Sequence, residues 1–464
     1  MVFAIDLGVT TADVLPMPIA RKALAAATTA FAFATPAAAQ LSPAEQTIVR
    51  TVEEGFEQDV ALLEAITEVN SGTHNHAGVR EVGQMLVPQF EALGFDVEWI
   101  DQDHVDRAGH LFARHEGDSD GARILLIGHI DTVFEPDSPF QQFVRHTENG
   151  VDMATGPGVV DDKGGIVVVL SALRAMAEAG TLTGANIVVA LTGDEEDAGD
   201  PIAQSRPHLI EAGQWADVAL GFEGLSVVDG RDMGVVARRS SNSWTLTTSG
   251  RTGHSSGVFS EHAGYGAIYE MARILDALRV ELPEENLTYN VGFMAGGTPA
   301  TLGEDELSAS AVGKTNIIAD SAVARGDLRT LSQDQTDRAV AAMQAIVDAN
   351  LPGTDAQIAF EFRYPPMSPS EGNSALLDRL NRINADMGLE TMGVFPPARR
   401  GAADISFVAP HAHALAGMGP DGSGSHAEGE SVDLRSMVRQ AQRAAILMSR
   451  LAENPRTRRI FLPE

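Results

Sequence analysis

Residues 122–133 read ARILLIGHIDTV, an apolar run that ends in a histidine and an aspartate. A run of this length and composition is typical of a buried strand. A helix-like segment follows at 163–180, and two more apolar, strand-like segments lie at 184–193 and 215–224. Continuous apolar strands that alternate with helices indicate a sheet covered on both faces. The sequence therefore predicts an α/β domain with a mixed, mainly parallel sheet.

From about Ser240 the pattern changes to strand- and helix-like stretches in the order β-α-β-β-α-β. These stretches are residues 242–250, 262–282, 287–297, 321–330, 332–351 and 356–364. This order is that of a split βαβ sandwich. We therefore expect an inserted α+β, ferredoxin-like domain over residues 236–362. The main domain would comprise residues 40–235 and 363–464 and would end in a helix.

Residues 17–40, MPIARKALAAATTAFAFATPAAAQ, have the form of a secretory signal peptide. Arg21 and Lys22 give a positive start, an apolar stretch follows, and small residues precede Gln40. The apolar run is too short and too rich in Ala and Thr for a good membrane anchor. We expect residues 1–39 to be absent from the mature protein. Because residues 1–16 fit no part of the signal pattern, we expect translation to start at Met17 rather than at Met1. The mature protein would be periplasmic or secreted, with no membrane attachment after cleavage.

The chain has 464 residues, a formal net charge of −31 and no cysteine. Such an acidic chain is a poor partner for a nucleic-acid backbone, and it would favour cations. Without cysteine, any metal must be held by His, Asp and Glu.

Polar side chains follow each of the three predicted strands. In open α/β sheets, ligands bind beyond the carboxyl ends of the strands, so these side chains should share one rim. An acidic run at such a place is more often a helix N-terminus, but the joint placement of several such groups favours a metal site. Carboxylates and imidazoles can hold zinc, and two bridged metals with a further carboxylate as base form a hydrolytic device. The candidates that follow the strands are His129, Asp131, Glu195, Glu196 and Glu223, and the Gly-rich segment GPGVVDDKGG adds Asp161 just before a helix.

Seven short motifs follow one another along the chain. They are GHIDTV, GPGVVDDKGG, TGDEED, GFEG, SGRTGHSSG, NIIADSAVARGDLR and GSGSHAEGE. Over residues 57–450 they resemble the motifs of the co-catalytic zinc exopeptidases, which include bacterial glutamate carboxypeptidase, succinyl-diaminopimelate desuccinylase and aminoacylase. The pattern is closest to glutamate carboxypeptidase. The resemblance implies an enzyme with two zinc ions per subunit, with other divalent metals left open, and a peptide or N-acyl amino acid as substrate.

The resemblance also implies the metal ligands. Asp161 would bridge the two metals, and a cis peptide bond would precede Asp162. His129 and Glu223 would each hold one zinc, one per metal, partnered by Glu196 and His426.

Further roles follow from the same motifs. Asp131 would orient the ring of His129. Glu195 would be the general base, taking a proton from the attacking water and returning one to the leaving amine.

The inserted domain would be a lid and the dimerisation domain. His254 would reach the active site of the partner subunit and stabilise the oxyanion. Asn316 and Arg329, thirteen positions apart (329 − 316), would grip the substrate carboxylate, and the backbone of Gly401 would line the substrate pocket. Arg329 could instead only pair with Asp327.

Three features depart from the family pattern. Asp200 stands where serine is common, the segment 298–315 before Asn316 is long, and the surroundings of His426 are unusually polar. Two His-x-His pairs, at 74–76 and 411–413, are interpreted as surface or loop histidines.

These observations favour a zinc-dependent carboxypeptidase that acts beside a free C-terminal carboxylate, with glutamate as a candidate product. A dipeptidase or an N-acyl-amino-acid amidohydrolase is the main alternative. A catalytically dead binding protein on the same scaffold is less consistent with the retained base.

Overall fold

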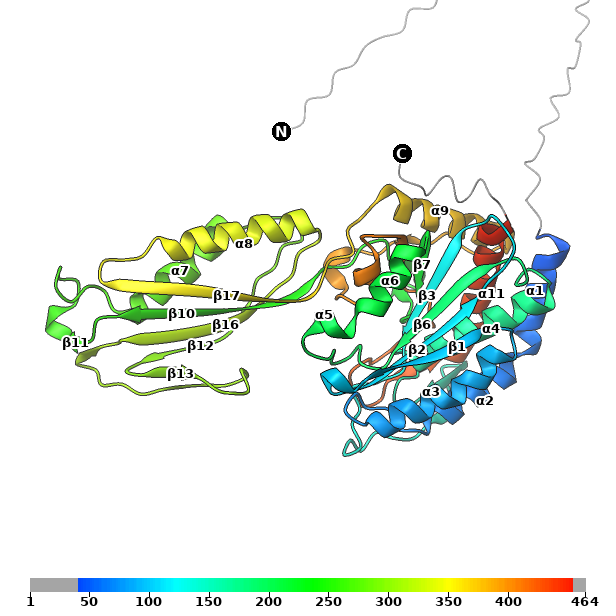
Figure 1. The fold of residues 1–464 in the computed structure, drawn as a ribbon, viewed down its shortest axis with the longest axis horizontal. Helices are drawn as coiled ribbons and strands as arrows, with labels where there is room; N and C mark the ends of the chain where they lie inside the picture. The colour runs from blue at the N-terminus through cyan, green and yellow to red at the C-terminus, as the bar shows by residue number, and fades with distance from the viewer. Residues whose placement is uncertain (1–40, 454–464) are drawn as a thin grey trace, which may run out of the picture. The chain divides into compact units, whose positions relative to one another are not determined.

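The central sheet has six strands in the order β1-β2-β6-β3-β7-β19 (Figure 1). The computed structural model describes residues 41–453, so the predicted signal peptide lies outside the described residues. Strands β6, β3, β7 and β19 run parallel, while β1 and β2 form an antiparallel edge. The predicted fold class, a mixed and mainly parallel sheet, is confirmed. The strands are β1 (Asp96–Gln102), β2 (Arg107–His115), β3 (Arg123–His129), β6 (Asn186–Thr192), β7 (Val218–Gly221) and β19 (His413–Leu415).

The apolar runs of the parallel strands are explained by burial on both faces. Side chains alternate across a strand, so neighbouring residues of β3 enter different cores. Ile124 and Leu126 join a core with α4 (Lys163–Glu178) and α11 (Leu434–Glu453). Leu125 and Ile127 join a second core with α6 (Pro207–Trp215) and α10 (Ile405–Val408).

The main domain contains further helices and two small sheets. The helices are α1 (Pro43–Glu54), α2 (Phe56–Thr67), α3 (His76–Glu91), α5 (Ile202–Ser205) and α9 (Glu371–Asp386), with 3₁₀ turns Asp103–Val105 and Pro397–Arg399. One small sheet contains β20 (Gly422–Ser423), β21 (Ser431–Asp433), β5 (Val151–Thr155) and β4 (Val144–Glu148). The other contains β18 (Gly393–Val394), β9 (Arg231–Gly234) and β8 (Ser226–Val228). No helix among residues 41–453 combines the length and apolar character needed to cross a membrane.

The inserted segment forms a four-stranded antiparallel sheet in the order β12-β16-β10-β17. Its elements follow the predicted β-α-β-β-α-β order: β10 (Ser241–Gly250), α7 (Ala267–Glu281), β12 (Val291–Gly297), β16 (Ser321–Leu328), α8 (Gln333–Asp348) and β17 (Thr354–Tyr364). Apolar side chains of α7 and α8 pack with Trp244 and Leu246 of β10 in one core. Both helices cover the same face of the sheet (Figure 1). A separate ladder joins β11 (Gly253–His254) to β15 (Ile317–Ile318), and the 3₁₀ turn Ser255–Gly257 follows β11.

The long segment before Asn316 has a structure of its own. Within it, β13 (Ala300–Leu302) pairs with β14 (Ala309–Ala311) in an antiparallel hairpin. The residues by which this segment exceeds the usual length therefore form a hairpin within the inserted domain.

Candidate metal centre

The candidate ligands lie at one end of the parallel strands. His129 is the last residue of β3, Glu196 follows β6, and Asp161 lies in the turn that leads into α4. A histidine nitrogen of His129 and one carboxylate oxygen each from Asp161 and Glu196 lie within 4.8 Å of one another. The structure therefore brings these three predicted ligands together at the carboxyl ends of the sheet.

The carboxylate of Asp161 faces two histidines. Its Oδ1 lies 3.0 Å from Nε2 of His129, and its Oδ2 lies 3.3 Å from Nε2 of His426. Nε2 of His426 also lies 3.0 Å from Oε2 of Glu196. This is the arrangement that a bridging carboxylate requires, and the expected cis bond between Asp161 and Asp162 is present.

The division of ligands differs from the one that the resemblance implied. Glu196 and His426 were expected on different metals, but their side chains are in direct contact on the Oδ2 side of Asp161. The geometry favours Glu196 and His426 as ligands of one metal position. His129 then belongs to the other position, on the Oδ1 side.

Glu223 follows β7 at the same rim, but its carboxylate contacts arginines. Nη1 of Arg238 lies 2.8 Å from Oε2 of Glu223, and Nη2 of Arg400 lies 3.7 Å from it. Glu223 is not part of the group of ligand atoms within 4.8 Å of one another that His129, Asp161 and Glu196 form. Its role as a metal ligand stays a prediction.

The electrostatics of this group suit a divalent cation. Burial raises the pKa of Glu195 well above its ordinary value, and the charges of Glu223 and Glu196 raise it further, against His129. Burial also raises the pKa of Glu196. For Asp161, hydrogen bonds from His129 and His426 outweigh burial and lower the pKa. Imidazole and carboxylate donors without thiolates fit zinc, and a bound cation would offset the crowded negative charge.

Asp131 is fully buried and serves two parts of the site. Nδ1 of His129 donates to the backbone carbonyl of Asp131 at 3.0 Å and lies 3.4 Å from its Oδ1. This orients Nε2 toward Asp161, as the sequence predicted. Asp131 also accepts the backbone N–H of Glu195 at 3.0 Å and that of Glu196 at 3.1 Å. Sequence reasoning missed this second role.

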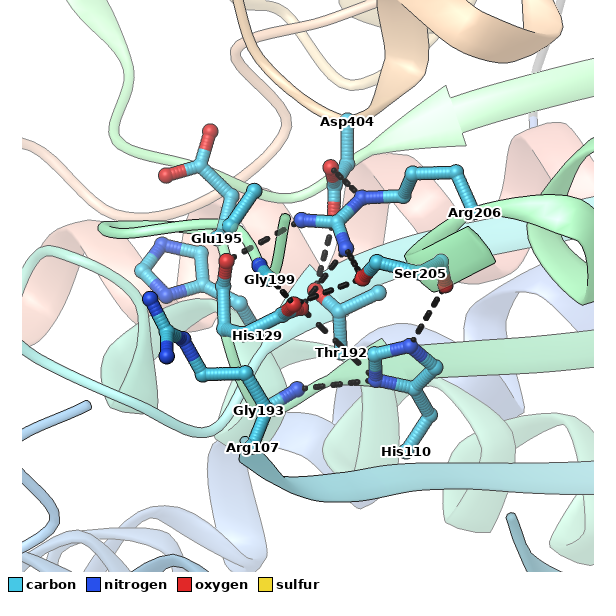
Figure 2. A network of polar contacts seen from close by, with 12 residues as sticks. Arg107, His110, His129, Thr192, Gly193, Glu195, Gly199, Ser205, Arg206 and Asp404 are labelled. Atoms are coloured by element: carbon cyan, nitrogen blue, oxygen red, sulfur yellow. Dashed lines mark hydrogen bonds and ion pairs between the residues drawn. The ribbon is translucent and has the colours of Figure 1, made fainter. Parts of the chain in front are cut away.

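A buried polar network supports the acidic loop (Figure 2). Asp194 is fully buried and pairs with Nη1 of Arg206 at 2.7 Å. Arg206 also pairs with Asp404 at 2.8 Å. At the surface, Asp197 pairs with Arg107 at 3.0 Å and with His74 at 3.1 Å, which agrees with His74 being a loop histidine. Nothing in the sequence motifs indicated Arg206 or Asp404.

Glu430 is a further buried carboxylate, to which the sequence motifs assigned no role. It accepts the backbone N–H groups of Gly158, Val160 and Asp161 at 3.0, 2.7 and 2.9 Å. Its only signal in the sequence was its place in GSGSHAEGE, four positions after His426. The carboxylate thus connects the loop of His426 to the turn that carries Asp161.

The predicted residues of the inserted domain fall into two places. His254 pairs with Ile317 in the β11–β15 ladder, and Ser255 donates to the carbonyl of Asn316 at 2.9 Å. Arg329 pairs with Asp327 at 2.9 Å, and a Cβ atom placed on Gly401 would lie 3.8 Å from Nη1 of Arg329.

The structure thus places His254 close to Asn316, and Arg329 close to Gly401. Within residues 41–453, no hydrogen bond or ion pair joins either pair directly to His129, Asp161 or Glu196. Arg238, which pairs with Glu223, also donates from its Nε to the carbonyl of Gly401 at 2.6 Å.

Histidine and carboxylate ligands at the end of a parallel sheet, with a buried acid beside them, define the class of metal-dependent hydrolases. The model of peptidase family M20/M25/M40 matches residues 125–452, and the chain belongs to this family. It is a metallopeptidase-type hydrolase, as the motifs predicted.

Curated relatives agree with this assignment, and a solved structure shares the fold. Carboxypeptidase G2 of Pseudomonas sp. (strain RS-16) is 25% identical over 401 residues, which cover 84% of this chain and 88% of the relative. Succinyl-diaminopimelate desuccinylase of Leptothrix cholodnii is 26% identical over 340 residues, covering 72% and 83%. The crystal structure of aminopeptidase PepT from Bacillus cereus matches with a TM-score of 0.66 at 19% identity, covering 86% of this chain and 99% of that one. At that identity the structural match shows the fold alone.

Proposed function

We propose that the protein is a carboxypeptidase with two zinc ions, which hydrolyses the amide bond beside a free C-terminal carboxylate. The observation that carries the proposal is the carboxylate of Asp161, whose two oxygens face His129 and His426 separately. The similarity to carboxypeptidase G2 supports this reaction type. The resemblance of the motifs to those of glutamate carboxypeptidase makes glutamate a candidate product.

Zinc, when bound by these residues, would polarise the scissile carbonyl and acidify the attacking water. Glu195 takes the proton of that water and delivers it to the leaving amine. Its carboxylate points away from the buried network in Figure 2, while its backbone is fixed below. A carboxyl group whose pKa is raised by burial is suited to both halves of this transfer.

Substrate binding is assigned to two places, one formed by His254 and Asn316 and the other by Arg329 and Gly401. Arg329, beside Gly401, binds the free carboxylate of the substrate, for which a guanidinium is well shaped. His254 and Asn316 act on the site of a partner subunit in a homodimer. An exposed aromatic cluster near His254 supports such an interface, since the rings of Phe259 and Tyr269 lie 5.1 Å apart and each side chain is 53% exposed.

The general base is tested by Glu195→Gln. We expect this variant to keep its metal content and to lose several orders of magnitude in kcat, because the amide cannot take the proton. Glu211→Gln changes an exposed glutamate of α6 in the same way and should leave kcat unchanged. Near-normal turnover of Glu195→Gln would remove Glu195 as the base.

The reaction type is tested by a hydrolysis screen of N-acyl amino acids, dipeptides and longer peptides, with and without chelator. Release of free C-terminal amino acids from longer peptides, abolished by chelation, is the expected result. Cleavage of dipeptides or N-acyl amino acids alone would favour the alternatives. Activity that withstands chelation would overturn the metal dependence, and no hydrolysis at all would favour a binding protein.

A further inference from the structure

The two peptide units on either side of Glu195 have all four of their polar groups bound by side chains. Asp131 accepts the N–H groups of Glu195 and Glu196. On the opposite edges, Nη2 of Arg206 donates to the carbonyl of Asp194 at 3.0 Å, and the hydroxyl of Tyr364 donates to the carbonyl of Glu195 at 2.8 Å. Four such bonds fix both backbone dihedrals of Glu195, and with them the point from which its side chain extends.

Arg206 is held too firmly to act as a flexible partner. It is 0% exposed and pairs with Asp194 and with Asp404. Asp404 in turn accepts the hydroxyl of Thr192, the last residue of β6, at 2.6 Å. A buried guanidinium between two carboxylates has its desolvation offset and its plane fixed.

Tyr364 extends this support to the far side of the acidic loop. Its hydroxyl accepts from Nη2 of Arg206 at 3.1 Å while donating to Glu195. Its ring is 8% exposed and packs on Phe407, with ring centroids 5.0 Å apart. The residue before it, Arg363, donates to the carbonyl of Ala198 at 3.1 Å. The end of β17 therefore holds two carbonyls of the acidic loop.

We infer that Tyr364 is a positioning residue for the general base, acting through the backbone of Glu195 with Arg206 behind it. The inference rests on the proposed function, in which Glu195 transfers the proton. Proton transfer requires a short distance from the carboxylate to the water, so a small shift of the Glu195 backbone lowers the rate rather than substrate affinity.

The test is Tyr364→Phe, which removes one hydroxyl and keeps the ring. We expect kcat to fall between about 10- and 100-fold while KM and metal content stay unchanged. The matched control is Tyr289→Phe in the inserted domain, whose hydroxyl donates to the carbonyl of Leu278 at 2.9 Å. This control should keep the wild-type kcat. Wild-type kcat in Tyr364→Phe would overturn the inference.

The same substitution is then made in the Glu195→Gln protein. If Tyr364 acts through Glu195, it changes the residual kcat of that variant by less than about 2-fold. An equal loss in both backgrounds would show a general structural role and overturn the inference.

Arg206→Lys is a second variant, because one ammonium cannot reach the carbonyl of Asp194, Asp404 and Tyr364 together. It should show the same loss of kcat at constant KM, and wild-type kcat in this variant would also overturn the inference. If Glu195→Gln itself retains turnover, the proposed function fails and the inference with it. If Glu195→Gln is inactive but Tyr364→Phe is normal, only the positioning role fails.

Discussion

Four consecutive acids, residues 194–197, coexist because each has a different environment. Asp194 is buried against Arg206, and Asp197 is half exposed beside Arg107. Glu196 contacts His426, and Glu195 is a half-buried residue whose pKa is raised by the burial of its carboxyl group. The four neighbouring acids therefore lie in separate environments: the outer two bind the loop to the protein, and the inner two are the ones that we propose bind metal and transfer the proton.

His110, beneath this loop, gives a pH prediction. Its Nδ1 accepts the N–H of Gly193 at 3.3 Å and its Nε2 contacts the carbonyl of Ser205 at 3.0 Å, which requires the neutral ring. Burial lowers its pKa below the ordinary value, against the charge of Asp194. The unfolded chain therefore binds a proton near pH 6.5 that the folded protein does not, so this contribution to stability is present above pH 6.5 and is lost as pH falls below it.

The measurement is the unfolding free energy of the chelated protein between pH 5 and 8. We expect His110→Gln to flatten the loss of stability below pH 6.5 by up to about 1.4 kcal/mol per pH unit, the value for one proton. Parallel curves for the two proteins would contradict the assignment of a neutral buried ring.

Among single residues, the sequence predicts best those whose side-chain type is required by the chemistry of the site. His129, Asp161 and Glu196 could be named as candidate ligands because few residue types bind metals, and because His129 and Glu196 follow strand ends while Asp161 lies just before a helix. Arg206 and Asp404 could not, since 198 positions separate them and nothing local links a buried ion pair to the loop it supports.

At the scale of elements, Glu430 joins the two loops that carry Asp161 and His426. Its carboxylate accepts three N–H groups of the turn before α4. In Glu430→Gln, the amide group would bring N–H donors against those of the turn, so the turn should shift.

We expect Glu430→Gln to weaken zinc binding by about 10- to 100-fold, as measured by competition with a chromophoric chelator. Glu428→Gln alters an exposed glutamate of the same loop and should bind zinc normally. Unchanged affinity in Glu430→Gln would show that the turn holds its shape without this carboxylate.

The elements themselves were unequally predictable. Strands β3, β6 and β7 could be predicted because burial on both faces leaves a continuous apolar run. The antiparallel edge strand β1 has a mixed burial pattern, and the small sheet of β4, β5, β20 and β21 joins segments more than 250 positions apart. The alternation of polar and apolar residues in β1 covers only residues 96–99, which is short for a prediction, and no local pattern indicates the pairing of the small sheet.

At the scale of the molecule, metal binding and stability should be linked. The site gathers several carboxylates whose mutual repulsion a bound cation would offset. Because the unfolded chain lacks this arrangement, zinc at 100 times its Kd should add about 2.7 kcal/mol to the unfolding free energy. Calorimetry with and without chelator tests this: we expect a lower Tm on chelation that zinc restores, and an unchanged Tm would contradict a preformed metal centre.

The proposed dimer makes the active site a property of two chains. His254 is exposed on the inserted domain and has no hydrogen bond or ion pair with the metal ligands of its own described chain. If it acts on the partner's site, equal amounts of Glu195→Gln and His254→Ala subunits should recover activity after exchange. Half of the dimers are then mixed and one of their two sites is complete, so we expect about a quarter of wild-type activity.

The matched control mixes Glu195→Gln with His129→Ala. Both changes lie in the site of the chain that carries them, so no mixed dimer contains a complete site and no activity should return. Recovery in the first mixture alone requires that His254 is supplied across the interface. Failure of both mixtures to recover, with subunit exchange verified by native mass spectrometry, would place His254 in the site of its own chain and remove the dimer from the mechanism.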